Sequence, residues 1–85
     1  MLVIVQNESA IVEVTSIFPF ASKKIDGTTK YALLGETRDG KRTHLASYEA
    51  EQQLRSALNV VLLQVRSQIR KTGDARSVFL DLANL

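Results

Sequence analysis

The chain has 85 residues and a formal charge of +2, with 11 Lys and Arg against 9 Asp and Glu. This length indicates one domain, residues 1–85. The chain has no Cys and one His, which excludes a disulfide framework, thiolate zinc sites, a cysteine nucleophile and the paired imidazoles of common zinc sites.

The first residues lack the positive charge of a signal peptide, and their apolar run is shorter than a signal sequence needs. No stretch approaches the roughly 20 apolar residues of a membrane helix. We therefore expect a cytoplasmic protein that does not associate with membranes.

Two β-branched runs, residues 2–6 and 10–18, predict strands joined by a tight turn. Pro19 cannot donate a ladder hydrogen bond, so it is expected to end the second strand at a sheet edge or in a loop. Residues 19–29 are rich in turn formers, and Asp26–Gly27 is the predicted bend of a loop.

Residues 30–37 and 42–46 predict a hairpin that turns at Asp39–Gly40 in a type I′ turn. A two-residue loop would form the pairs Arg38–Lys41, Glu36–Thr43 and Leu34–Leu45. One face would then carry Leu34 and Leu45, and the other Tyr31, Leu33 and Ala46. Because strand side chains alternate, a slip of one residue would exchange these faces.

Residues 47–71 predict a long helix that Ser47 caps and that ends before Gly73. Its apolar stripe recurs at spacings of three and four, in Leu54, Ala57, Leu58, Val61, Val65 and Ile69. The segment 77–82 predicts a last short strand. The order predicts an α+β fold, in which an antiparallel-dominated sheet of four to five strands packs on one long helix.

The pattern resembles a loose group of short uncharacterised proteins from Gram-positive bacteria and their phages. The matching positions are Ile11, Val12, Val14, Thr15, Ser16, Ile17, Lys30, Tyr31, Leu45, Tyr48, Glu51, Ala57 and Leu58. The resemblance covers about residues 1–70 and implies the α+β fold, with no activity to carry over. Ala50 stands where that group usually has a capping Ser or Thr, which leaves the helix cap to Ser47.

No residue pattern predicts catalysis, a cofactor or a metal. His44 is expected as a partly exposed sheet residue facing Gly35, with no catalytic partner that the sequence can place. Glu49 and Glu51 are two apart, so on a helix they point in different directions and are interpreted as favourable charges near the positive end of its dipole.

Two features of the predicted helix bear on function. Arg55, Arg66 and Arg70 fall on one basic line, which could contact nucleic acid although Leu63 interrupts it and no helix aromatic accompanies it. Val60 and Leu63 lie off the apolar stripe, at roughly 120–150° from its centre. They are expected to be covered by the C-terminal segment 77–85, to be covered by a second protomer, or to stay exposed.

The leading interpretation is a non-enzymatic protein-interaction module. It would be a homodimer through Val60 and Leu63 or through an edge strand, or it would bind another protein. The alternatives are a nucleic-acid-associated protein that uses the basic line, and a phage-type inhibitor that docks on a host protein.

Overall fold

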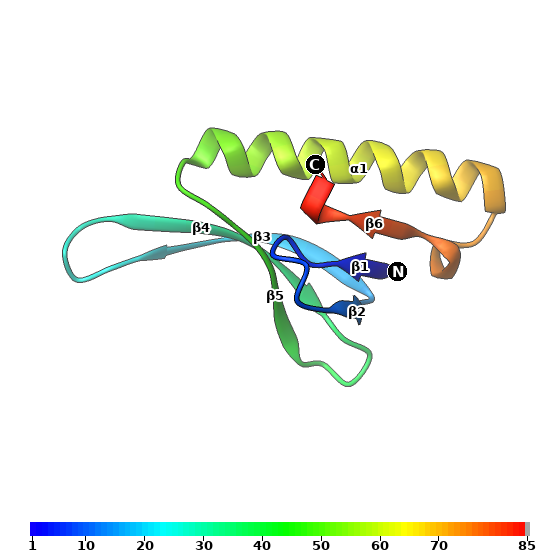
Figure 1. Ribbon diagram of the computed structural model, residues 1–85, viewed down its shortest axis with the longest axis horizontal. Helices are drawn as coiled ribbons and strands as arrows, with labels where there is room; N and C mark the ends of the chain where they lie inside the picture. Colours follow the sequence, from blue (N-terminus) through cyan, green and yellow to red (C-terminus); the bar gives the residue numbers. More distant parts are fainter. Residues whose placement is uncertain (85) are drawn as a thin grey trace.

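The computed structural model describes residues 1–84, which form six strands and one long helix (Figure 1). The strands are β1 (Leu2–Ile4), β2 (Ile11–Glu13), β3 (Ser16–Lys23), β4 (Thr29–Glu36), β5 (Arg42–Tyr48) and β6 (Phe79–Asp81). The helices are α1 (Glu51–Thr72) and the short 3₁₀ turns η1 (Ala75–Ser77) and η2 (Leu82–Asn84).

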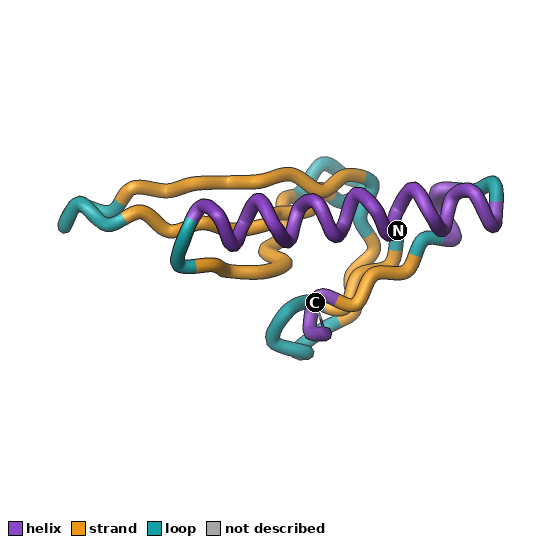
Figure 2. Tube along the Cα trace, turned by 90° about the horizontal axis from the view of Figure 1, so that it is seen from above, coloured by secondary structure: helices purple, strands orange, loops and turns teal. Residues whose placement is uncertain are grey.

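The strands make two three-stranded sheets, in the orders β2–β1–β6 and β3–β4–β5. All pairs are antiparallel except β1–β6, which is parallel. The predicted α+β class with one long helix is confirmed, although the strands number six in two sheets rather than four to five in one. Helix α1 crosses both sheets (Figure 2).

The predicted strand 10–18 is divided because its backbone changes partner. The Val14 N–H donates to the Met1 carbonyl at 2.9 Å, whereas the Thr15 N–H donates to the Glu36 carbonyl at 2.7 Å. Residues before this point therefore pair with β1, and those after it pair with β4. The two sheets also meet at β5, where the Gln6 N–H donates to the Leu45 carbonyl at 2.9 Å.

Pro19 lies inside β3 and does not end it. The loop predicted over residues 19–29 is therefore limited to residues 24–28. Strand β3 is an edge strand in which Pro19 stands opposite Leu33. An edge tolerates proline because its nitrogen can face the open side, where no ladder donor is needed. The actual turn is closed by the Lys24 N–H, which donates to the Thr28 carbonyl at 2.7 Å.

The β4–β5 hairpin departs from the predicted two-residue loop. The Thr37 N–H donates to the Lys41 carbonyl at 2.8 Å, and only Gly40 of the turn has positive φ, at 84°. This is a three-residue loop with glycine in the left-handed position. Glu36 consequently stands opposite Arg42, where Thr43 was predicted.

A bulge then shifts the pairing of β4 with β5 by one residue between Leu33 and Leu34. Leu34 stands opposite His44 and Leu33 opposite Ala46, so Leu45 has no partner on β4. The predicted division of faces is wrong: Leu33, Leu45 and Ala46 are all buried in one core, whereas Leu34 is half-buried.

Helix α1 begins at Glu51 rather than at residue 47, and Ser47 lies in β5. Ala50 is the N-cap residue, and its side chain accepts no hydrogen bond. The Gln53 side chain serves this end instead, because its Oε1 accepts from the N–H groups of Glu49 and Ala50 at 3.1 and 3.2 Å. The predicted end is confirmed: Gly73 has φ 70° and donates to the Ile69 carbonyl.

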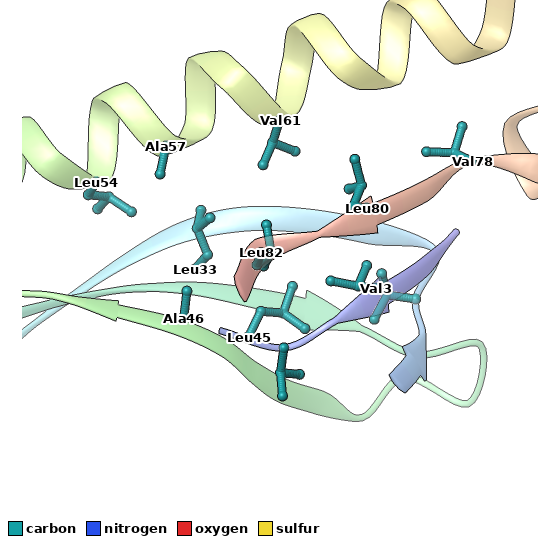
Figure 3. Close-up of a cluster of buried hydrophobic side chains, with 12 residues drawn as sticks. Val3, Leu33, Leu45, Ala46, Leu54, Ala57, Val61, Val78, Leu80 and Leu82 are labelled. Carbon is teal, nitrogen blue, oxygen red and sulfur yellow. The ribbon is translucent and has the colours of Figure 1, made fainter. Parts of the chain in front are cut away.

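The predicted apolar stripe faces the sheets. Leu54, Ala57 and Val61 point into the core (Figure 3), and the other stripe members pack against it partly buried. The predicted C-terminal strand is present as β6, with Leu80 and Leu82 buried beneath the helix. The Gln68 side chain holds β6 to α1, since it donates to the Phe79 carbonyl and accepts from the Phe79 N–H, both at 2.7 Å.

Candidate interaction surface

The four apolar residues from Val60 to Leu63 divide between the core and the surface. Val61 is 3% exposed and packs on the sheets, whereas Val60, Leu62 and Leu63 are 39%, 45% and 65% exposed. At about 100° per residue, Val60 and Leu63 lie on one flank of the helix and Leu62 lies on the other. The structure therefore brings together the two residues predicted as an interface.

Further exposed residues continue this flank along the whole helix. We call the set the outer seam; its members are Gln53, Ser56, Val60, Leu63, Ser67 and Arg70. Their spacing alternates between three and four residues, which keeps a set of side chains on one side of a helix. The seam has apolar residues at its middle, small serines on either side and polar residues at its ends.

A groove with a volume of about 820 Å³ runs beside the seam, between α1, the end of β5 and η2. Its lining residues include Glu49, Gln53, Ser56, Ala57, Val60 and Leu82. Ala57 and Leu82 are buried, so they form an apolar floor, and the exposed residues form a mostly polar rim. The surface beside Val60 is therefore hollow, whereas the exposed Leu63 lies outside this lining.

The C-terminal segment, as far as residue 84, leaves Val60 39% and Leu63 65% exposed. Strand β6 pairs with β1, and η2 contacts β1 and lies beside the middle of α1 (Figures 1 and 2), where Leu82 lines the groove together with Val60. Leu85, the last residue of the predicted covering segment, lies outside the described residues. Of the three situations expected for Leu63, covering by the C-terminal segment is therefore excluded for residues 77–84.

The predicted basic line is present on the outer side of α1, where Arg55, Arg66 and Arg70 are all exposed. Arg55 is engaged within the helix, because its guanidinium lies 2.7 Å from the Glu51 carboxylate. This exposed ion pair occupies one member of the line and contributes little to stability.

Sequence reasoning missed a second basic feature, the protruding end of the β3–β4 hairpin. This arm, residues 20–32, extends past the N-terminal end of α1 (Figures 1 and 2). It carries three lysines, Lys23, Lys24 and Lys30, against the single acid Asp26, a net charge of +2 that equals the charge of the whole chain. Hydrogen bonding to Lys30, and then repulsion between the two charges, lowers the pKa of Lys24.

A second exposed apolar group lies on the outer face of the β2–β1–β6 sheet. Leu2 and Phe79 are neighbours across β1 and β6, and Ile11 stands opposite Ile4 across β1 and β2. Leu2, Ile11 and Phe79 are exposed. The signal for this patch was present in β1, where apolar residues occupy both faces of the strand.

His44 lies on β5 opposite Leu34, and Thr43, not His44, stands opposite Gly35. Its Nε2 lies 2.7 Å from the Ser47 hydroxyl, and both residues are exposed. In residues 1–84 no carboxylate hydrogen-bonds to the ring to complete the arrangement of a catalytic triad.

Over the described part of the chain, His, Asp and Glu form no group of three or more suited to a metal ion. Helix α1 is not apolar enough along its length to cross a membrane, and the same holds for the other helices up to residue 84. Comparison of the chain with protein-family models, with curated proteins and with solved structures finds no match.

Proposed function

We propose that the protein is a non-enzymatic, cytoplasmic interaction module that forms a homodimer through the outer seam of α1. The observation that carries this proposal is the exposure of Val60 and Leu63 at the middle of a long, well-anchored helix. A helix that packs on sheets through one stripe gains nothing within its own fold from apolar residues on its far flank. A partner that covers them gives these two residues a role.

The exposed area sets the strength expected of the dimer. Val60 is 39% exposed and Leu63 is 65% exposed, so burying what remains of both in two protomers contributes about 3–6 kcal/mol. Association costs about 4 kcal/mol or more in lost rigid-body freedom, so these residues alone cannot hold a tight dimer. With the polar ends of the seam contributing the rest, we expect a dissociation constant in the micromolar range.

The seam is a better interface than the open edge of β3. Pro19 lacks an N–H in the middle of this strand, and Lys23 adds a charge at its end. Proline and lysine on an edge both oppose the addition of another strand. The apolar residues of the seam have no comparable protection.

The oligomeric state tests the proposal directly. We expect sedimentation velocity from 5 to roughly 500 µM to show a reversible rise from monomer to dimer mass, a range chosen for a micromolar dissociation constant. Leu63→Gln removes the more exposed of the two apolar seam residues and should yield a monomer. Leu62→Gln is the matched control, because Leu62 is also an exposed leucine, at 45% against 65% for Leu63, but lies on the other flank. A wild-type chain that stays monomeric over the whole range contradicts the proposal, as does equal loss in both variants.

A second candidate function, nucleic-acid binding, is favoured by the position of the net charge. The arm concentrates +2 on a protruding two-stranded ribbon, an element that the major groove of DNA admits. Phosphate contacts by Lys23 and Lys24 would make binding weaken as the salt concentration rises.

Fluorescence anisotropy with a short labelled duplex should then show binding at low salt that Lys23→Gln/Lys24→Gln weakens. The variant Arg66→Gln/Arg70→Gln removes the same charge from the helix and separates the arm from the predicted basic line. Absence of binding at low salt rejects this function for both surfaces.

A further inference from the structure

We infer that the two α1 helices of the dimer lie antiparallel, with the two-fold axis passing between Val60 and Leu63. Val60 of one protomer then packs against the partner's Leu63. This inference rests on the dimer proposed above and adds the geometry of its interface, with a second copy of this chain as the partner.

The spacing of the seam indicates helix-to-helix packing. Its six positions alternate by three and four residues, which is the a/d pattern of a coiled coil over three successive pairs. The apolar residues occupy the central pair, and serines occupy the pair members on either side. Small residues beside a central apolar contact allow two helix backbones to approach closely along the remainder of the seam.

The seam is symmetric about the centre of the helix. Helix α1 spans Glu51–Thr72, so its midpoint falls between Val61 and Leu62, which is also the midpoint between Val60 and Leu63. Turning the helix end for end about this point exchanges Val60 with Leu63, Ser56 with Ser67 and Gln53 with Arg70. An isologous two-fold contact requires such a self-complementary surface. The antiparallel arrangement therefore aligns both helices over their full length and matches apolar with apolar residues and serine with serine.

Charge selects the antiparallel arrangement over the parallel one. The C-terminal end of α1 carries Arg70 and Lys71, and a parallel pair would place these cations against their own copies. In the antiparallel pair the partner's Arg70 lies beside Gln53, in the part of the groove that Glu49 lines. The helix dipoles also oppose each other favourably, since each positive N-terminus lies near a negative C-terminus.

The shapes of the two halves of the seam agree with this pairing. Leu63 is the most exposed seam residue that is apolar, and Val60 borders the groove. Because Leu63 is matched with Val60 and not with itself, each protruding leucine meets the hollow side of the partner. Because the dimer is two-fold symmetric, the partner's Leu63 fills the groove of each protomer in the same way.

Disulfide trapping tests the geometry, and the absence of native Cys makes the background clean. Ser56→Cys and Ser67→Cys are small changes at exposed positions. In the antiparallel pair Ser56 faces the partner's Ser67, whereas two copies of Ser56 are eleven residues apart, about 16 Å along the axis. Under mild oxidation we expect a mixture of the two variants to give at least several-fold more covalent dimer than either variant alone. Leu62→Cys, on the other flank, is the control and should stay near background.

The possible results separate the geometry from the function. If each serine variant alone gives as much covalent dimer as the mixture, the helices are parallel. This inference is then overturned while the dimer stands. If sedimentation shows a wild-type dimer but no seam variant cross-links above Leu62→Cys, the interface lies elsewhere and the inference is again overturned. A monomeric wild-type chain overturns the dimer itself.

Discussion

Gly35 on β4 is expected to be one of the least replaceable residues of the fold, because a side chain there would collide with the core. A Cβ at this position would lie 2.6 Å from Val14 Cγ1 and 3.2 Å from Leu45 Cδ1. Both neighbours are buried, so neither can move aside into solvent. Gly35 lies on the central strand, opposite Ile17 on one side and Thr43 on the other, which also holds the backbone in place.

Overpacking of this kind costs about 1–3 kcal/mol. Replacing Gly by Ala reduces the entropy of the unfolded chain, which offsets about 0.4–1 kcal/mol of that cost. We therefore expect Gly35→Ala to lower the free energy of unfolding by about 1–2 kcal/mol. In a domain of this size that corresponds to a fall of roughly 5–15 °C in Tm. Urea unfolding followed by far-UV circular dichroism measures the change.

A double-mutant cycle identifies the cause. Val14→Ala removes the methyl group that the new Cβ would strike, at a cost of about 2 kcal/mol in lost burial and cavity formation. In Gly35→Ala/Val14→Ala the added methyl occupies part of the space that was vacated. The double variant should be more stable than the sum of the single losses predicts, by about 1 kcal/mol. Additive losses, or a Gly35→Ala variant as stable as the wild type, would refute the close approach of Val14 to β4.

Three further predictions concern local interactions. Ala50→Ser should raise the free energy of unfolding by about 1 kcal/mol in thermal denaturation, because the N-cap residue has extended dihedral angles and lacks a side-chain acceptor; an unchanged Tm contradicts it. Gln68→Ala should speed amide hydrogen exchange in Phe79–Asp81 and cost about 1–2 kcal/mol, since both hydrogen bonds to Phe79 are lost; unchanged exchange would show that β1 alone holds β6. The hydroxyl of Thr28, and then its N–H, hold the pKa of Asp26 below its ordinary value of 3.8. This contribution to stability is present above pH 3.8 and is lost as the pH falls through the lower folded pKa, so Thr28→Val should raise the pKa of Asp26 in an NMR titration.

The elements that local chemistry determines were predicted well. The helix stripe and the Gly73 cap depend on residues close together in the sequence, and both are confirmed. The helix start was misplaced because Ser47, a good N-cap residue, is held in β5 by strand pairing and by its N–H bond to the Gln6 side chain at 2.9 Å. A capping preference near 1 kcal/mol does not outweigh a strand that buries Leu45 and Ala46.

The strand errors have one cause, which is that partners distant in sequence decide where strands divide and shift. Val14 and Thr15 are adjacent, but their N–H groups bond to Met1 and Glu36. The bulge on β5 likewise exists because it turns both Leu45 and Ala46 into the core. Neither choice leaves a local signal, since the same residues would suit an unbroken strand.

The candidate surface was predictable in part. Exposure of Val60 and Leu63 follows from their angular position on a helix whose stripe is already complete. The groove beside Val60 could not be predicted, because Leu82 reaches its floor only through the pairing of β6 with β1. The charged arm was missed for a related reason: Lys24 and Lys30 are brought together by a hairpin whose first strand runs through Pro19.

The position of β6 explains why Leu63 remains available to a partner. The strand is held by β1 through the parallel ladder and by α1 through the two bonds of Gln68 to Phe79. Leu80 and Leu82 are buried in the same core as Val61. For residues 79–84 to rise over Leu63, these hydrogen bonds would break and two leucines would return to water, at a cost of several kcal/mol. Covering one leucine that is already partly buried recovers at most about 2 kcal/mol. Covering of Leu63 by residues 79–84 is therefore unfavourable, and a second molecule can bury Leu63 without disturbing the fold.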